Sequence, residues 1–141
     1  MKILLILTFM VLLLSLSSPA RAELVVVVHP ANPVNELKRE QVVDIFMGRK
    51  QNFPAGSAAL PIDLAADSPL RSAYYRDLVG KTVPQVNAYW ARLLFTGRAT
   101  PPRVMPDAQA VLKSVRENRD AIAYLDSKDV DGKVKVVYQL K

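Results

Sequence analysis

Hydrophobic and polar positions follow two different periods along this chain, and the alternation between them predicts a mixture of strands and helices. The continuous apolar run at Leu24–His29 is typical of a strand that is buried on both faces, and Ala121–Leu125 predicts another apolar strand. Leu60–Leu64 predicts a further strand, and Lys133–Tyr138, with partial alternation of apolar and polar residues, predicts another.

Apolar residues at helical spacing predict four helices. The predicted helices are Lys38–Phe46, Ser68–Val79, Thr82–Phe95 and one that begins after Asp107. Gly97–Met105 is predicted to be a turn-rich connection. The resulting order of strand, helix, strand, three helices, strand and strand predicts one layered α/β domain.

The same pattern predicts the core. Neighbouring residues on a helix point about 100° apart, so in each of the pairs Tyr74-Tyr75 and Tyr89-Trp90 one ring can face the core and the other solvent. Trp90 is expected to be the buried member of its pair, because it is in register with Val86. The residues expected to be mostly buried are Val26, Val28, Ile45, Phe46, Ile62, Trp90, Leu94, Leu112, Val115, Ile122 and Tyr124.

Residues 1–22 are predicted to be a signal peptide. A basic start is followed by the apolar segment Ile3–Leu14 and then by Ala20-Arg21-Ala22, a small-x-small cleavage signal. The apolar segment is too short to span a bilayer comfortably, and no cysteine follows the cleavage site to carry a lipid. We therefore expect an exported periplasmic protein that is soluble after cleavage, with residues 23–141 as its one domain.

Composition narrows the class of function. The chain contains no cysteine, which excludes disulfides, thiolate catalysis and zinc–thiolate sites. The formal net charge of +6 at pH 7, which stays positive after loss of Lys2 and Arg21, favours small anions or an acidic partner. No basic run is dense enough, or sufficiently interleaved with aromatic residues, to indicate nucleic-acid binding.

A candidate anion site lies in the loop and helix start that follow Leu60–Leu64. Ser68 is a suitable N-cap, and Pro69 fits the first helical position. The next three amides, those of Leu70, Arg71 and Ser72, are expected to point out of the helix start without an intrahelical partner, at the positive end of the helix dipole. The Arg71 side chain, expected at the surface, would add a planar fork of donors. The alternative interpretation is an ordinary capped helix with a surface arginine.

A possible pocket rim is the second candidate feature. Asn32, Arg98 and Arg103 are its candidate residues, and the two arginines flank Thr100-Pro101-Pro102. The alternative is that these arginines are solvated loop residues.

Catalysis is poorly supported. His29 is the one histidine of the chain, no Gly-x-Ser-x-Gly elbow accompanies it, and it is expected to be a strand-end residue. Asp126, Asp129 and Asp131 have half of the spacing of a calcium loop, but glycine and glutamate stand in the wrong places, so a solvated acidic turn is expected. We expect no enzymatic activity, metal or cofactor.

Several segments in sequence resemble the phosphate-binding branch of the periplasmic substrate-binding proteins of ABC transporters. Val25–Lys50 contains an Asn-Pro loop, a helix that ends in Ile-Phe, and then Gly-Arg, as in that family. Ser68-Pro69-Leu70-Arg71 stands where the family carries Ser-Gly-Thr, often followed by Arg. Ala121–Leu125 looks like the family's Ala-Ile-Gly-Tyr-Val strand, and Phe95-Thr96-Gly97 with Pro101-Pro102 looks like the short, single-lobe members.

The resemblance covers nearly all of residues 23–141 and implies one lobe of a periplasmic-binding-protein-like fold, with a central mixed sheet flanked by helices. Pro69 lacks the amide that glycine would offer, Leu70 lacks the threonine hydroxyl, and Asp63-Leu64 stands where phosphate binders tend to carry arginine. Only Ser68 and Arg71 therefore carry over as side-chain ligands.

Two functional hypotheses follow. The first is weak or partner-assisted binding of an inorganic oxyanion, with phosphate the prime candidate, in ABC-type phosphate uptake; a second copy or an envelope protein would close the site. The second is a non-enzymatic interaction module of the same ancestry that docks on an envelope transporter, porin or sensor. A hydrolase would need a nucleophile and a base that the sequence does not offer.

Overall fold

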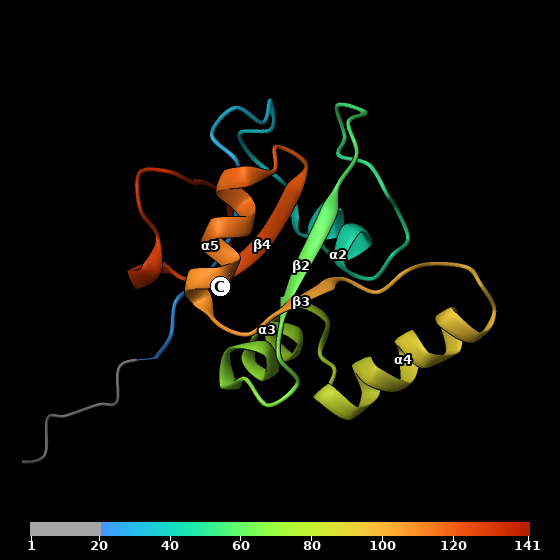
Figure 1. Cartoon of the computed structure of the whole chain (residues 1–141). Coiled ribbons are helices and arrows are strands. Elements are labelled where there is room, and N and C mark those ends of the chain that lie inside the picture. Colours follow the sequence, from blue (N-terminus) through green and yellow to red (C-terminus); the bar gives the residue numbers. More distant parts are fainter. Residues whose placement is uncertain (1–20) are drawn as a thin grey trace, which may run out of the picture.

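The computed structural model describes residues 21–141, so the predicted signal peptide lies outside the described residues apart from its last two positions. Figure 1 shows the helices and strands. Their bounds are β1 Leu24–Val28, α2 Arg39–Phe46, β2 Leu60–Leu64, α3 Pro69–Val79, α4 Val83–Phe95, β3 Arg103–Met105, α5 Ala108–Glu117, β4 Ala121–Asp126 and β5 Lys135–Gln139, with a 3₁₀ turn at Ser127–Asp129. Every predicted helix and strand is present.

The strands form one mixed sheet in the order β3-β2-β4-β1-β5. β2 runs parallel to both β3 and β4, whereas β1 is antiparallel to β4 and β5. The parallel strands β2, β3 and β4 therefore have their carboxyl ends at one edge of the sheet and their amino ends at the opposite edge. The predicted mixed sheet with flanking helices is confirmed.

β3 was missed by the sequence analysis, which predicted a turn-rich connection over its residues. The strand has three residues, and Arg103 and Val104 are both exposed, so it carries no apolar run. It forms because it adds to the free edge of β2, with Ile62 opposite Arg103 and Leu64 opposite Met105. The pairing is set by tertiary structure and leaves no periodic signal in the sequence.

The core lies on both faces of the sheet. α5 covers one face, and α2 and α3 cover the other (Figure 1). On the α2–α3 face, the Tyr74 ring stacks on the Tyr124 ring with centroids 3.8 Å apart, and Phe46 meets Tyr74 edge-on at 5.2 Å. Tyr74 and Tyr75 are both fully buried, so the expectation that one would face solvent is wrong for this pair.

The predicted core is otherwise confirmed with one exception. Leu94 is 56% exposed, whereas each of the other residues expected in the core is buried. The first turns of α4 pack against the body of the protein through Val86 and Trp90, and the Tyr89 hydroxyl donates to the Met47 carbonyl at 2.6 Å. The last turn of the helix extends beyond this contact, so Leu94 finds no core to enter.

Candidate anion site at the carboxyl end of β2

The start of α3 has the capped geometry that the sequence predicted. Ser68 has extended backbone angles, and its hydroxyl oxygen accepts a hydrogen bond from the Arg71 amide at 3.4 Å. Pro69 occupies the first helical position, and Gly80, in the left-handed conformation, ends the helix. The helix start lies just beyond Leu64, at the edge where the parallel strands have their carboxyl ends.

Fewer amides are free at this helix start than predicted. The Arg71 amide donates to the Ser68 hydroxyl, and the Ser72 amide donates to the Ser68 carbonyl at 3.2 Å. The Leu70 amide has no hydrogen-bond partner among residues 21–141. The prediction of three amides without a partner is therefore wrong, and Leu70 alone supplies one.

The Arg71 side chain is buried, which corrects the expectation that it lies at the surface. The residue is 7% exposed, and its Nε donates to Asp63 Oδ2 at 3.2 Å. Its Nη2 donates to Asn87 Oδ1 at 3.1 Å, and the guanidinium carbon lies 5.2 Å from the centre of the Tyr75 ring. The cause is Asp63, because a carboxylate inside the protein requires a cation beside it.

Asp63 is the centre of this buried polar cluster. Its Oδ1 accepts the Leu64 amide at 2.8 Å and the Tyr124 hydroxyl, and its Oδ2 accepts the Tyr75 hydroxyl at 2.7 Å together with Arg71 Nε. Both oxygens are thus fully engaged by donors from β2, β4 and α3. The carboxylate and the guanidinium neutralise each other.

Burial keeps the surrounding phenols protonated. It raises the pKa of Tyr74, Tyr75 and Tyr124 above the usual value for tyrosine, and the nearby Asp63 carboxylate raises each of them further. Tyr75 and Tyr124 therefore remain hydrogen-bond donors to Asp63 at neutral pH.

An external anion at the start of α3 would meet donors of limited strength. Arg71 Nη1 is buried without a hydrogen-bond partner in the described chain, so one polar group of the guanidinium is still unsatisfied. Its positive charge, however, already has a counterion in Asp63. The helix start also carries the Leu70 amide and the hydroxyls of Ser68 and Ser72, of which Ser72 belongs to an exposed residue.

The three residues predicted at a pocket rim do not meet. Asn32 is 3% exposed. Its side chain accepts a hydrogen bond from the Val34 amide of its own loop at 2.9 Å and donates one to the Arg119 carbonyl, between α5 and β4, at 2.9 Å. Its buried position contradicts the rim prediction. Arg98 is exposed in the loop after α4, and Arg103 is exposed at the first position of β3.

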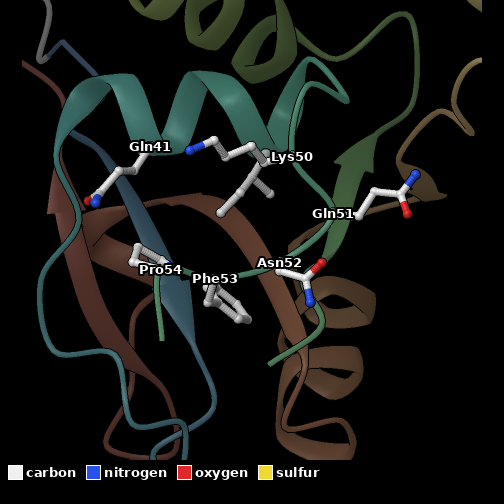
Figure 2. Close-up of a pocket in the computed structure, with 7 residues that line it drawn as sticks. Gln41, Lys50, Gln51, Asn52, Phe53 and Pro54 are labelled. Atoms are coloured by element: carbon white, nitrogen blue, oxygen red, sulfur yellow. The ribbon is translucent and has the colours of Figure 1, made fainter. Parts of the chain in front are cut away.

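The start of α3 lines neither of two hollows that lie elsewhere in the described part of the chain. The smaller, of about 380 Å³, lies between α2 and the loop that follows it (Figure 2), with Gln41 and Lys50 beside the helix and Phe53 between Asn52 and Pro54 in the loop. The larger, of about 670 Å³, includes Leu60 and Ala121, the first residues of β2 and β4, along with Arg103. Arg103 thus does line a pocket, but at the opposite edge of the sheet from Ser68.

The weaker candidates have structural roles. His29 lies at the end of β1, where its Nδ1 accepts the Ala31 amide at 3.0 Å. Asp126 caps the 3₁₀ turn, and Asp131 forms an ion pair with Arg116. Within residues 21–141 no group of three or more His, Cys, Asp or Glu side chains is placed to hold a metal ion.

The Asp63 cluster is the feature that sequence reasoning missed. A signal was present, because Asp63 interrupts an otherwise apolar strand and Arg71 follows eight positions later. A carboxylate inside a buried strand predicts a nearby cation. Its further partners Tyr124 and Asn87 come from distant parts of the chain and carried no such signal.

The sequence matches no protein-family model and no curated protein. Its structure is similar to that of an ABC-type phosphate transport receptor from Vibrio cholerae (TM-score 0.66, 22% identity, 82% of this chain and 45% of that one). It is equally similar to a putative phosphate ABC transporter substrate-binding protein with bound phosphate from Clostridium perfringens (0.66, 20%, 82% and 44%). PstS from Borrelia burgdorferi matches at 0.64 and 13% identity, over 82% of this chain and 46% of that one.

These likenesses establish the fold. The chain has the architecture of part of a phosphate-receptor-type binding protein, which agrees with the resemblance seen in the sequence. It spans less than half the length of each of these proteins.

Proposed function

We propose that this chain is an exported, non-enzymatic binding protein that holds an inorganic oxyanion weakly at the start of α3, in the context of ABC-type phosphate uptake. The observation that carries the proposal is the Leu70 amide without a partner in a helix start capped by Ser68, at the edge of the sheet where the parallel strands end, in a fold like that of phosphate-binding proteins. Phosphate is the first candidate ligand.

Weak binding follows from the charge balance at this helix start. The helix dipole contributes about 0.3–1 kcal/mol toward an exposed anion. A free arginine would add a charge-assisted hydrogen bond, but Asp63 already neutralises Arg71. We therefore expect a dissociation constant of about 1 mM or weaker for the isolated chain, corresponding to about 4 kcal/mol or less.

A covering surface would strengthen the binding. An oxyanion held by a few donors at an exposed helix start stays hydrated, and excluding water would strengthen each of these contacts. We propose that an envelope protein or a second copy of the chain provides this cover.

The location is also part of the proposal. Cleavage after Ala22 would release residues 23–141 into the periplasm. Among residues 21–141 no helix is long and apolar enough to cross a membrane.

The test replaces a neutral residue at the helix start by an acidic one. Ser72 is exposed, and Ser72→Asp places a carboxylate in the first turns of α3, where it repels an anion while the helix dipole tolerates it. Gln109→Asp, an exposed change in the first turn of α5, is the matched control. Calorimetric titration with phosphate and with sulfate should show weak binding to wild type and Gln109→Asp, and none to Ser72→Asp.

Two results would overturn the proposal. Equal phosphate binding by wild type and Ser72→Asp would place the anion elsewhere. Absence of any oxyanion binding by the wild-type protein would leave the second hypothesis, a non-enzymatic docking module, as the function to pursue.

A further inference from the structure

The last turn of α4 presents two large apolar side chains to solvent. Phe95 is 94% exposed and Leu94 is 56% exposed. The other large apolar residues that are exposed in the described chain, Leu60, Val104 and Val136, range from 42% to 59% and lie on separate strands. An almost fully exposed phenylalanine beside an exposed leucine is the strongest apolar feature of this surface.

The helix end that carries these side chains is held in a fixed conformation. The Thr96 hydroxyl donates to the carbonyls of Arg92 and Leu93 at 3.2 and 3.0 Å. The amides of Gly97 and Arg98 donate back to the carbonyls of Leu94 and Leu93, each at 3.1 Å, and Gly97 adopts a positive φ. These bonds cap the helix, so the exposed pair is displayed at a defined position, which lowers the entropy cost of binding a partner.

The rest of α4 extends the same outward surface. In Figure 1 the helix points away from the sheet, and a long loop returns from its end to β3. Val86 and Trp90 face the body of the protein, whereas Ala88 and Ala91 are exposed. Ala88 and Ala91 precede Phe95 by seven and four positions, so the three residues share one face of the helix.

The segment that carries this face has only basic residues among its charged ones. Residues 78–106 contain no aspartate or glutamate, and their four charged residues are Lys81, Arg92, Arg98 and Arg103. Within residues 21–141 none of these four forms a salt bridge. Arg92 lies over the Tyr89 ring at 5.9 Å from its centre, and it is exposed.

We propose that the outward face of α4, formed by Ala88, Ala91 and Phe95 with the exposed Leu94 at its border, docks into an apolar groove with an acidic rim on another protein. Helix-in-groove recognition uses apolar anchors at this spacing, and acidic residues around the groove would pair with the free arginines. A second copy of this chain fits less well, because two such faces would bring like charges together.

The third candidate partner for this face is the surface of an anionic bilayer, and the composition of the face does not favour it. Interfacial helices bury a broad apolar face in the membrane, whereas here two alanines separate one Leu–Phe pair from the start of the helix. Asn87 of α4 contacts Arg71 at the start of α3, and Phe95 lies about two turns farther along the helix. Variants at Phe95 therefore test docking independently of oxyanion binding.

The test uses two dye-labelled helical peptides of about three heptads. Both have leucine along one face; one carries glutamate at the flanking positions and the other carries lysine. Fluorescence anisotropy should show that the acidic peptide binds the full chain at least about tenfold more tightly than the basic peptide, and that added salt weakens the complex. Phe95→Ser should lower the affinity by about tenfold, and Arg98→Glu should lower it severalfold.

Matched controls separate this face from general surface effects. Val136→Ser removes an exposed apolar side chain from β5, and Lys113→Glu reverses an exposed charge on α5. Both should bind the acidic peptide as wild type does. Equal affinity for the two peptides, no binding of the acidic one, or unchanged binding by Phe95→Ser would overturn the proposal. Self-association of the wild type that Phe95→Ser abolishes, or binding only to phosphatidylglycerol vesicles, would also overturn it by assigning the face to another occupant.

Discussion

At the scale of single residues, Asp63 decides what the candidate anion site can do. Its carboxylate already gives the Arg71 guanidinium the kind of contact that a bound oxyanion would make. The Asp63 side chain is 3% exposed and the Arg71 side chain is 8% exposed, so water screens the interaction between the two charges only weakly. The chain thus carries an internal anion one residue before the end of β2.

Asp63→Asn removes this internal anion while keeping the shape of the side chain. Breaking a buried ion pair costs about 3–5 kcal/mol, so the melting temperature should fall clearly. Phosphate or sulfate should then raise the melting temperature of Asp63→Asn more than that of wild type, at matched ionic strength, because Arg71 has lost its counterion. Thermal unfolding followed by circular dichroism measures both effects.

A surface aspartate provides the control for that change. Asp77 pairs with Arg76 where both side chains are about a third or more exposed, so Asp77→Asn should cost at most about 1 kcal/mol and create no selective response to phosphate. If phosphate stabilises wild type and Asp63→Asn equally, Arg71 does not take part in anion binding.

The buried phenols give the cluster a characteristic pH dependence. The pKa values of Tyr75 and Tyr124 are raised in the folded protein by burial and by Asp63, above the unfolded value of 10.0. Their contribution to stability is therefore complete below about pH 10 and declines above it, as the unfolded chain loses its phenol protons first. Chemical unfolding at about pH 8 and about pH 11 should show this loss.

Tyr75→Phe tests which group is responsible for the pH effect. The variant loses a hydrogen bond to a charged carboxylate, which costs about 1.5–3 kcal/mol at neutral pH. Because it also lacks one of the titrating phenols, its stability should fall less steeply between the two pH values. An identical slope in wild type and Tyr75→Phe would exclude Tyr75 as a source of the pH dependence.

At the scale of helices and strands, the spacing of apolar residues predicted most of the elements, and the incorrect predictions have one physical cause. β3 and the exposed end of α4 both depend on what lies beside them in three dimensions. Val104 lies in a segment whose sequence predicts turns, but in the structure it pairs with Asp63 of the neighbouring strand. Leu94 continues the apolar stripe that Val86 and Trp90 form on α4, but it lies in the last turn of the helix, which has no core to pack against. Burial of Arg71 has the same origin, since its cause is a carboxylate on another element.

The position of α4 depends on a close contact at Gly48, and a pair of glycine substitutions tests it. Gly48 has a φ of 71°, and a Cβ there would lie 2.6 Å from the Trp90 ring. Gly80 has a φ of 67°, and a Cβ there would meet nothing within 4 Å. Both alanine variants incur backbone strain of about 1–2 kcal/mol, but only Gly48→Ala adds the steric conflict, at about 1–3 kcal/mol.

Gly48→Ala should therefore unfold at a lower denaturant concentration than Gly80→Ala. It should also shift the emission of Trp90, the one tryptophan of the chain, because the ring must move to make room. Equal midpoints and an unchanged emission spectrum in the two variants would mean that α4 is not held in place by this contact.

At the scale of the whole molecule, the proposed cleavage site lies directly before the first strand of the sheet. Cleavage after Ala22 would leave Glu23 as the first residue, and β1 begins at Leu24. The Glu23 carbonyl accepts the Ser127 amide at 2.7 Å, so the residue next to the cleavage site already takes part in the fold. The strand that follows is completely buried and pairs with both β4 and β5.

This arrangement predicts a sharp limit to how much of the amino terminus can be removed. Mass spectrometry of the protein recovered from a periplasmic extract should give a chain that begins at Glu23. Protein produced from Glu23 onward should unfold cooperatively, because every strand of the sheet is retained. Removing residues 24–28 as well would take a central strand out of the sheet and leave β5 without a neighbour, so that shorter chain should not fold. Recovered protein that retains Met1, or a cooperative unfolding transition in the shorter chain, would contradict this boundary.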